Sequence, residues 1–269
     1  MPIHEFDPER NACINPEDII HRVPDMPKVV VTCFSHVTFA RLLADVGGVE
    51  ISHVKDAHST CPVYKTIYRG QEIALFNTTV GAPSCVGALE DVFAMGAECA
   101  VVFGTCGVLE PEIADCSVIV PDAALRDEGT SYHYAPPARE IAVNGRYLPA
   151  FRKLLDTLEC PYTVGKVWTT DAFYRETRAK MERRRREGCI CVDMECASVA
   201  AMAHFRGKDV LQFFYAADNL AAAQWDKRSL GNEDRLADKD KIAYLAMEMA
   251  AKMAADHAQG QGIVGADDT

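Results

Sequence analysis

The sequence predicts an α/β protein with a single domain, built around a mixed central β-sheet flanked by helices. Short apolar, β-branched runs alternate with helical segments along the chain, as in a sheet packed on both faces. Residues 99–103 are apolar at every position, which is typical of a central strand covered on both sides. A length of 269 residues with 49% hydrophobic content favours one large core over two.

The two ends of the chain differ from its centre. Residues 1–27 are polar and carry five prolines, so we expect an irregular arm that lies on the surface of the domain. The domain itself is expected to span residues 28–258. Residues 259–269 are small and polar, which predicts a disordered tail.

In the first half of the domain, the β-branched run at residues 28–33 predicts a buried strand. Residues 39–46 predict a helix that two glycines end. An Arg-Gly-Gln turn between two apolar runs predicts a hairpin within residues 64–78. Proline and serine shortly after Gly81 predict the start of a helix that ends at Gly96.

The second half continues the alternation. Strands are predicted at residues 99–103, 117–120, 162–168, 189–192 and 210–215, and helices at residues 195–205 and 241–255. In such sheets, ligands gather beyond the carboxyl ends of the strands. Three segments lie at these ends and are therefore candidates for a site: residues 104–107, 193–195 and 218–219.

Charge and cysteine content narrow the class of protein. The formal net charge of −11 leaves no broad basic surface, so we expect no nucleic-acid partner. The eleven cysteines are odd in number and lie within apolar runs without zinc-like spacing, which indicates reduced, buried thiols and no metal. No signal peptide and no stretch of ~20 apolar residues is visible, so we expect a cytoplasmic protein without a membrane partner.

Residues 104–107 (Gly-Thr-Cys-Gly) follow a buried strand. Two glycines there would let backbone amides and the Thr105 hydroxyl approach phosphate or ribose oxygens closely. An ordinary tight turn is the alternative.

Residues 192–195 (Val-Asp-Met-Glu) place Asp193 and Glu195 on either side of Met194, where a strand passes into a helix. One of the two carboxylates is explained by capping of the helix. A glutamate also accepts hydrogen bonds from two vicinal hydroxyls at once, as a ribose 2′,3′-diol offers. The pattern by itself leaves both interpretations open.

Asp218 follows an aromatic and apolar run. Burial there would raise its pKa and suit it to act as a general acid, and a turn residue paired with Asn219 is the alternative. Phe173 and Tyr174 would either stack on a base or belong to the core. Residues 183–186, four arginines in a row, predict a basic helix face in solvent.

Taken in order, these segments resemble the nucleoside phosphorylase family that includes uridine phosphorylase, hexameric purine nucleoside phosphorylase and methylthioadenosine-type nucleosidases. Residues 81–84 resemble its Gly-x-Pro-Ser helix start, and residues 104–107 its Gly-Ser/Thr-x-Gly turn. Residues 127–134 are close to the uridine-phosphorylase-like members, and residues 170–174 resemble Ser-Asp-x-Phe-Tyr. Residues 192–195 resemble the Glu-Met-Glu ribose grip.

The resemblance implies a ribose site of Asp193, Met194 and Glu195, in which Glu195 holds the 2′ and 3′ hydroxyls and Met194 packs on the sugar. It implies that Asp218 protonates N7 of a purine base. The base-binding residues that it implies are Phe173, Cys106, Gly107 and Asn219. The segment after Tyr174 lacks the Gln and Arg with which members read uracil, which places the base pocket nearer the purine type.

The chain departs from the family at the phosphate site. Where family phosphorylases carry Gly-Asp-Pro-x-Arg, residues 34–38 read Phe-Ser-His-Val-Thr, and a second arginine is replaced by Val102. A third, donated across a subunit interface, would fall near Ser59. The residues expected around a phosphate or a water are therefore Thr105, Ser35, His36 and a neighbour's His58.

The activity that the resemblance implies is cleavage of the N-glycosidic bond of a nucleoside by phosphorolysis, with inorganic phosphate as co-substrate and no cofactor. The missing arginines leave a nucleosidase that uses water as an alternative, and residues 127–134 favour the phosphorylase. A non-catalytic nucleoside sensor is a third interpretation, against which the presence of both Glu195 and Asp218 argues. The resemblance also implies a homodimer or hexamer with shared active sites.

Overall fold

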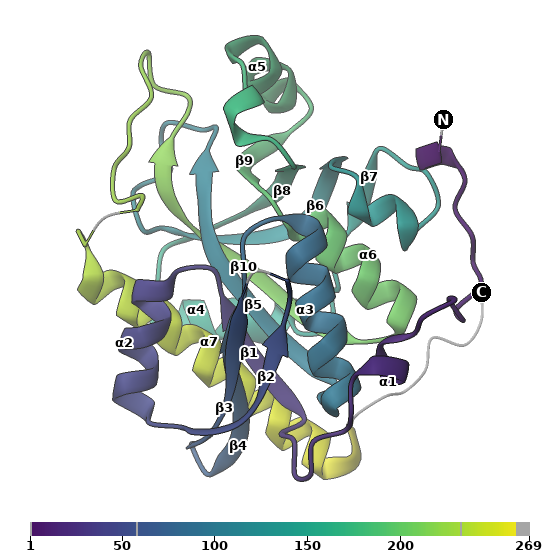
Figure 1. Cartoon of the computed structure of the whole chain (residues 1–269). Helices are drawn as coiled ribbons and strands as arrows, with labels where there is room; N and C mark the ends of the chain where they lie inside the picture. The colour runs from purple at the N-terminus through teal and green to yellow at the C-terminus, as the bar shows by residue number, and fades with distance from the viewer. Residues whose placement is uncertain (1, 58, 232, 262–269) are drawn as a thin grey trace.

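The computed structural model describes residues 2–57, 59–231 and 233–261, and within them ten strands form one mixed sheet (Figure 1). The strands are β1 (Val29–Cys33), β2 (Val49–Lys55), β3 (Thr60–Tyr68), β4 (Gln71–Asn77), β5 (Cys99–Val108), β6 (Val118–Asp127), β7 (Glu140–Ala142), β8 (Tyr162–Thr170), β9 (Cys189–Asp193) and β10 (Asp209–Asn219). The α-helices are α1 (Pro16–Ile19), α2 (His36–Val46), α3 (Ala82–Met95), α4 (Leu148–Thr157), α5 (Arg178–Arg186), α6 (Cys196–Arg206) and α7 (Leu236–Asp256). This architecture confirms the predicted fold class.

The sheet closes on itself around the end of β5. Strand β5 pairs in parallel with β1 over its first half and with β10 along its whole length. At its last two residues it pairs with β9, and the order β10, β6, β8, β9 leads back to β5. The carboxyl ends of β5, β9 and β10 therefore meet in one place.

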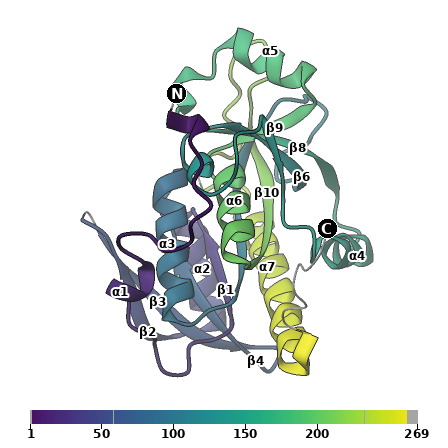
Figure 2. The same cartoon turned by 90° about the vertical axis from the view of Figure 1, so that its right-hand side faces the viewer.

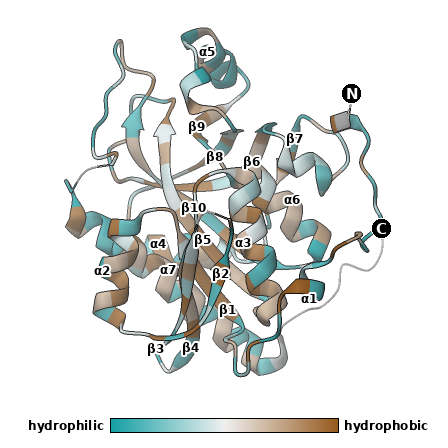
Figure 3. Ribbon diagram, in the orientation of Figure 1, coloured by the Kyte–Doolittle hydropathy of each residue, from teal (hydrophilic) through white to brown (hydrophobic). Residues whose placement is uncertain are grey.

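Both faces of the central strands are buried, which explains why their sequences are apolar throughout. In β1, Val29 and Val31 face the core cluster that includes residues of α2, α4 and α7, whereas Val30 faces the cluster formed with α3 and α6. Figure 2 shows α3 and α7 on opposite sides of the strands. Each valine buried in this way stabilises the fold by about 1.5–3 kcal/mol. In Figure 3, β1 is largely hydrophobic, whereas α5, at the top of the view, is largely hydrophilic.

The predicted elements are present, but helices α1 and α4 and strands β2 and β7 were not predicted. Strand β2 was not predicted because it is an edge strand whose side chains are mostly exposed, so its sequence lacks a continuous apolar run. Strand β5 continues through residues 104–107, so the predicted turn is wrong and these residues are part of a strand. Helix α2 begins at His36, three residues earlier than expected, because the Ser35 hydroxyl accepts a hydrogen bond from the Thr38 N–H.

The first residues of the chain lie along α3 and α6. The Val23 N–H donates to the Met95 carbonyl at the end of α3, and the Phe6 ring packs edge-on against Phe205 of α6. At the other end, η4 (His257–Gln261) continues α7, and the rest of the predicted tail lies outside the described residues. All eleven cysteines are free thiols, and most are buried. No helix in the described ranges is long and apolar enough to cross a membrane.

Candidate functional site

A cavity of about 860 Å³ opens where the carboxyl ends of β5, β9 and β10 meet. The site residues predicted from sequence that line it are Thr105, Cys106, Gly107, Phe173, Asp193, Met194, Glu195 and Asp218. The three segments that the sequence places at strand ends thus contribute to one cavity. Its volume lies within the range of small-molecule sites.

The two acidic residues at the end of β9 and the start of α6 lie in different surroundings. Asp193 is buried: its Oδ1 accepts from the Thr169 hydroxyl at 2.7 Å, and its Oδ2 accepts from the N–H groups of Glu195 and Cys196 at 2.9 and 2.6 Å. Asp193 therefore caps the start of α6 and fixes the chain on which Glu195 sits. Capping, one of the two interpretations of this pattern, accounts for Oδ2 of Asp193, and the Thr169 hydroxyl occupies Oδ1.

Glu195 is held by a segment that is distant in the sequence. Its Oε1 accepts from the backbone N–H of Gly81, 114 residues earlier in the chain, at 2.5 Å. Burial raises the pKa of Glu195, and the nearby charge of Asp193 raises it further, against the backbone N–H groups of Gly81 and Met194. A buried carboxylate of this kind is stabilised by a ligand that donates hydrogen bonds to it.

Asp218 lies at the end of β10, and its Oδ2 accepts from the indole N–H of Trp225 at 2.7 Å. Burial raises the pKa of Asp218, while the Trp225 N–H and the charge of Arg228 act in the opposite direction. Its Oδ1 lies beside Gly107, since a Cβ built on that glycine would stand 3.0 Å from it. The missing side chain of Gly107 therefore leaves room for this oxygen and for the Leu220 side chain, whose Cδ1 would stand 2.5 Å from the same Cβ.

The cavity lining also includes residues that were not predicted to belong to the site, among them Phe34, Glu176, Arg178 and Trp225. The Glu176 carboxyl group has no hydrogen-bond partner among the described residues, and burial, with the charge of Asp218, raises its pKa to about 7. Arg178 is the single cationic residue lining the cavity in the described part of the chain. Its guanidinium donates to the carbonyls of Leu220, Ala222 and Ala223.

Phe34 directly follows β1 and is the first residue of the segment 34–38, where the resemblance implies a phosphate site. A Cβ added to Gly104 would come within 2.4 Å of the Phe34 ring, so the ring packs directly on the backbone of β5. An apolar ring therefore covers this part of the cavity wall.

The structure does not bring all predicted site residues to the cavity. Asn219 does not line the cavity. Its Oδ1 accepts a hydrogen bond from the Ala221 N–H, which stabilises the loop after β10. The Ser35 hydroxyl caps α2, and His36 is exposed outside the cavity. His58 lies outside the described residues.

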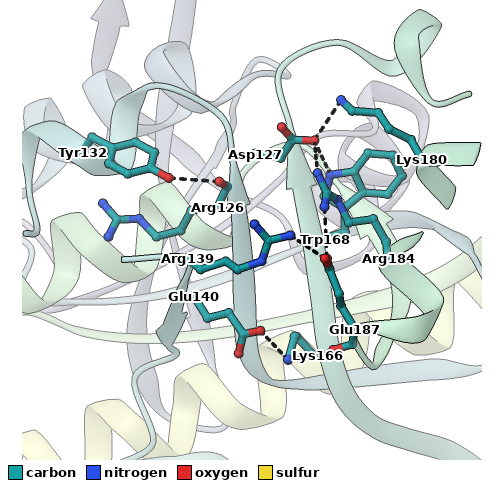
Figure 4. A network of polar contacts seen from close by, with 10 residues as sticks. All are labelled: Arg126, Asp127, Tyr132, Arg139, Glu140, Lys166, Trp168, Lys180, Arg184 and Glu187. Carbon is teal, nitrogen blue, oxygen red and sulfur yellow. Dashed lines mark hydrogen bonds and ion pairs between the residues drawn. The ribbon is translucent and has the colours of Figure 1, made fainter. Parts of the chain in front are cut away.

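A polar network holds α5 at the rim of the cavity (Figure 4). Asp127, at the end of β6, pairs with Lys180 and Arg184 of α5 and accepts from the indole N–H of Trp168. Arg184 is buried and also pairs with Glu187, so the predicted solvent-exposed helix face is wrong for this arginine. The network positions Arg178 and Met181, the α5 residues that line the cavity.

Replacing Gly107 with alanine is expected to lower kcat/KM roughly tenfold, because the new Cβ meets Asp218 Oδ1 at 3.0 Å and displaces it. The Cβ also meets the flexible end of Leu220 at 2.5 Å, so the free energy of unfolding should fall by no more than about 1–3 kcal/mol. Steady-state kinetics and thermal unfolding measure both. Gly145→Ala is the control, since nothing lies within 4 Å of its Cβ. Unchanged kinetics in Gly107→Ala would contradict the close approach.

The fold and the cavity define an α/β protein with a small-molecule site at the strand ends, lined by buried carboxyl groups. Comparison with known proteins agrees with this class. The chain matches the model of the phosphorylase superfamily over residues 28–256, and it belongs to that superfamily.

Two relatives are similar over most of the chain. The guanosine phosphorylase of Halorubrum lacusprofundi is 25% identical over 174 residues, which cover 65% of this chain and 71% of the relative. A DeoD-type 2 purine nucleoside phosphorylase of Aliivibrio fischeri is 23% identical over 215 residues, 74% of this chain and 86% of the relative. Among solved structures, the purine nucleoside phosphorylase of Toxoplasma gondii in complex with immucillin-H shares the fold, with a TM-score of 0.74 and 18% identity over 86% of this chain and 93% of that one.

Proposed function

We propose that this protein cleaves the N-glycosidic bond of a nucleoside, with inorganic phosphate as the attacking group, to release a free base and a pentose 1-phosphate. The observation that carries the proposal is that one cavity holds Glu195 and Asp218, both buried and presented by different strand ends. One acidic group to bind the sugar and one to protonate the leaving base are what this cleavage requires. The relatives named as phosphorylases support the same reaction.

In this proposal the Glu195 carboxylate accepts hydrogen bonds from the 2′ and 3′ hydroxyls of the sugar. A carboxylate offers about four acceptor positions, so the bond from Gly81 leaves capacity for a diol. Hydroxyl donors would offset the burial of the charge and favour the ionised form. Met194 packs on the sugar, and Asp193 holds the backbone of Glu195 in place rather than binding ribose itself.

Asp218 is the proton donor to the base. Cleavage passes through a state with positive charge on the sugar ring, and protonation of the base nitrogen lets it leave without a negative charge. Phe173 packs against the base at the mouth of the cavity, over a floor that includes Cys106 and Gly107. A purine fits this arrangement, because its N7 can take the proton.

Among the residues predicted to contact phosphate or water, Thr105 lines the cavity, so we assign it the contact with the attacking group.

Hydrolysis is the second candidate, and a specific observation favours it. The lining carries four carboxyl groups, those of Glu176, Asp193, Glu195 and Asp218, and each of them repels phosphate when it is ionised. Water as the nucleophile meets no such repulsion.

The test is the phosphate dependence of cleavage. Inosine, adenosine and uridine are incubated with the protein in phosphate and in a phosphate-free buffer, and ribose is separated from ribose 1-phosphate. We expect base release only with phosphate, together with ribose 1-phosphate. Free ribose at an unchanged rate without phosphate would replace phosphorolysis with hydrolysis, and no cleavage of any nucleoside would favour a sensor.

We propose further that the protein works as a homodimer or hexamer with shared sites. Val80, Phe173, Tyr174 and Trp225 are large apolar residues that line the cavity and remain more than half exposed in the single chain. Burial of such a rim by a second copy would also keep solvent from the reaction.

A further inference from the structure

The loop after β10 is folded back so that its one tryptophan reaches the end of the strand. Asn219 and Asp226 exchange backbone hydrogen bonds of 2.8 and 3.2 Å. The Asn219 side chain accepts from the Ala221 N–H, and Arg178 of α5 donates to three carbonyls of the loop. These contacts place the indole of Trp225 next to Asp218, where its N–H donates to Oδ2 at 2.7 Å.

The chemistry of this contact makes the two oxygens of Asp218 unequal. An indole N–H donates hydrogen bonds but accepts none, so Oδ2 must act as an acceptor toward it. When the carboxyl is protonated, the proton therefore belongs on Oδ1. That oxygen lies beside the backbone of Gly107, which lines the cavity together with Asp218.

We propose that Trp225 is a positioning residue for Asp218: its indole N–H holds Oδ2 as the acceptor, so that Asp218 carries its transferable proton on Oδ1, toward the base. The inference rests on the role of Asp218 proposed above. As the bond from C1′ to the base nitrogen breaks, its electron pair passes to the base, and the proton moves from Oδ1 to the base. The phosphate or water oxygen forms the new bond to C1′. The carboxylate left behind keeps the Trp225 hydrogen bond, and solvent returns the proton.

The charged groups around Asp218 act on it together with Trp225. Arg228 and Asp226, from the same loop, lower and raise its pKa respectively, and the charge of Asp218 in turn raises the pKa of Glu176. All three remain when Trp225 is changed to phenylalanine. A shift in the titration of Asp218 in that variant therefore reports the lost N–H.

The experiment is the pH profile of purine nucleoside cleavage by Trp225→Phe, which keeps an aromatic ring and removes the N–H. The proton donor must be protonated to act, so activity falls as the pH rises through the pKa of Asp218. Because the N–H stabilises the carboxylate, its removal should move this alkaline limb of kcat/KM upward by about one pH unit. The value of kcat should fall roughly tenfold, with a smaller change in KM.

The chain offers a matched control. Its second tryptophan, Trp168, makes the same kind of bond to Asp127 at 2.9 Å, but neither residue lines the cavity. Trp168→Phe should leave the position of the alkaline limb unchanged. If the limb does not move in Trp225→Phe, or moves equally in both variants, the proposal is wrong.

A measurement without turnover separates this proposal from the proposed function. With 15N-labelled tryptophan, the two indole N–H signals are assigned from the two phenylalanine variants and followed with pH. The Trp225 signal should titrate in the wild type and lose that titration in Asp218→Asn. If the Trp225 signal still titrates in Asp218→Asn, Trp225 is not paired with Asp218 and the proposal is wrong. If the wild type cleaves no nucleoside but the signal titrates as expected, the proposed function fails and the pairing of Trp225 with Asp218 stands.

Discussion

Replacing Glu195 with glutamine is expected to reduce kcat/KM for nucleoside cleavage by roughly 10²- to 10⁴-fold while the fold is kept. In the proposed complex the carboxylate accepts hydrogen bonds from two hydroxyls of the sugar. A hydrogen bond to a charged group contributes about 1.5–3 kcal/mol to the free energy of binding. Glutamine has the same shape, but only one of its two terminal atoms accepts. Initial rates at several nucleoside concentrations measure the loss.

The same substitution should not lower stability, which distinguishes it from a folding defect. Burial raises the pKa of Glu195, so folding favours its neutral form. The wild type therefore loses stability as the pH rises above the ordinary glutamate range, about 4 to 5, through the raised pKa of the folded state. Glutamine stays neutral, so the melting temperature of Glu195→Gln should match or exceed that of the wild type in mildly alkaline buffer.

Asp193→Asn provides the contrasting control. The two oxygens of Asp193 accept three hydrogen bonds inside the protein. An amide nitrogen in place of either oxygen would face a donor and leave it unpaired, at a cost of about 1–3 kcal/mol. This variant should melt earlier than the wild type. In this interpretation Asp193 fixes the backbone and Glu195 binds the sugar. A stable Asp193→Asn, or an unstable Glu195→Gln, would contradict this division of roles.

Asp218→Asn is expected to lower purine nucleoside cleavage by roughly 10²- to 10⁴-fold, the usual contribution of a general acid, and to affect uridine cleavage far less. A purine takes the proton at N7, whereas uracil has no such nitrogen. Rates on inosine and uridine, measured with the same preparation, give the ratio. Equal losses on both bases would mean that Asp218 does not protonate the base.

The asparagine variant keeps the local structure, which makes the comparison clean. The amide oxygen of asparagine still accepts the Trp225 N–H, and its NH2 group then takes the place of Oδ1 beside Gly107. The shape and the loop contact are retained, and the transferable proton is lost. Melting temperature and the indole signal of Trp225 check that the loop has not moved.

Much of the fold was predictable because it follows from local patterns. The apolar runs that form β1 and the first half of β5 are buried on both faces, which is possible only in the middle of a sheet. The segments near Thr105, Glu195 and Asp218 lie at carboxyl ends of strands, where an α/β sheet places its ligands. Edge strand β2 escaped prediction because its exposed side chains impose no apolar pattern.

The direction of each polar side chain was not predictable in this way. Asp193 and Glu195 look alike in sequence, but Asp193 points to the start of α6 and Thr169, whereas Glu195 reaches Gly81. Asn219 shapes a loop instead of binding a base, and Arg184 is buried against Asp127. Each outcome depends on a hydrogen-bond partner that only the folded chain supplies.

The sequence by itself therefore determined the α/β class, the central strands and the edge of the sheet at which a site forms, because burial patterns and strand order are properties of short segments. Only the tertiary structure decided which residues face the cavity, and it added Phe34, Glu176 and Trp225 from three separate segments. The physical reason is that a buried polar group must find a partner. Those partners, such as Trp225 for Asp218, are set by the path of the whole chain.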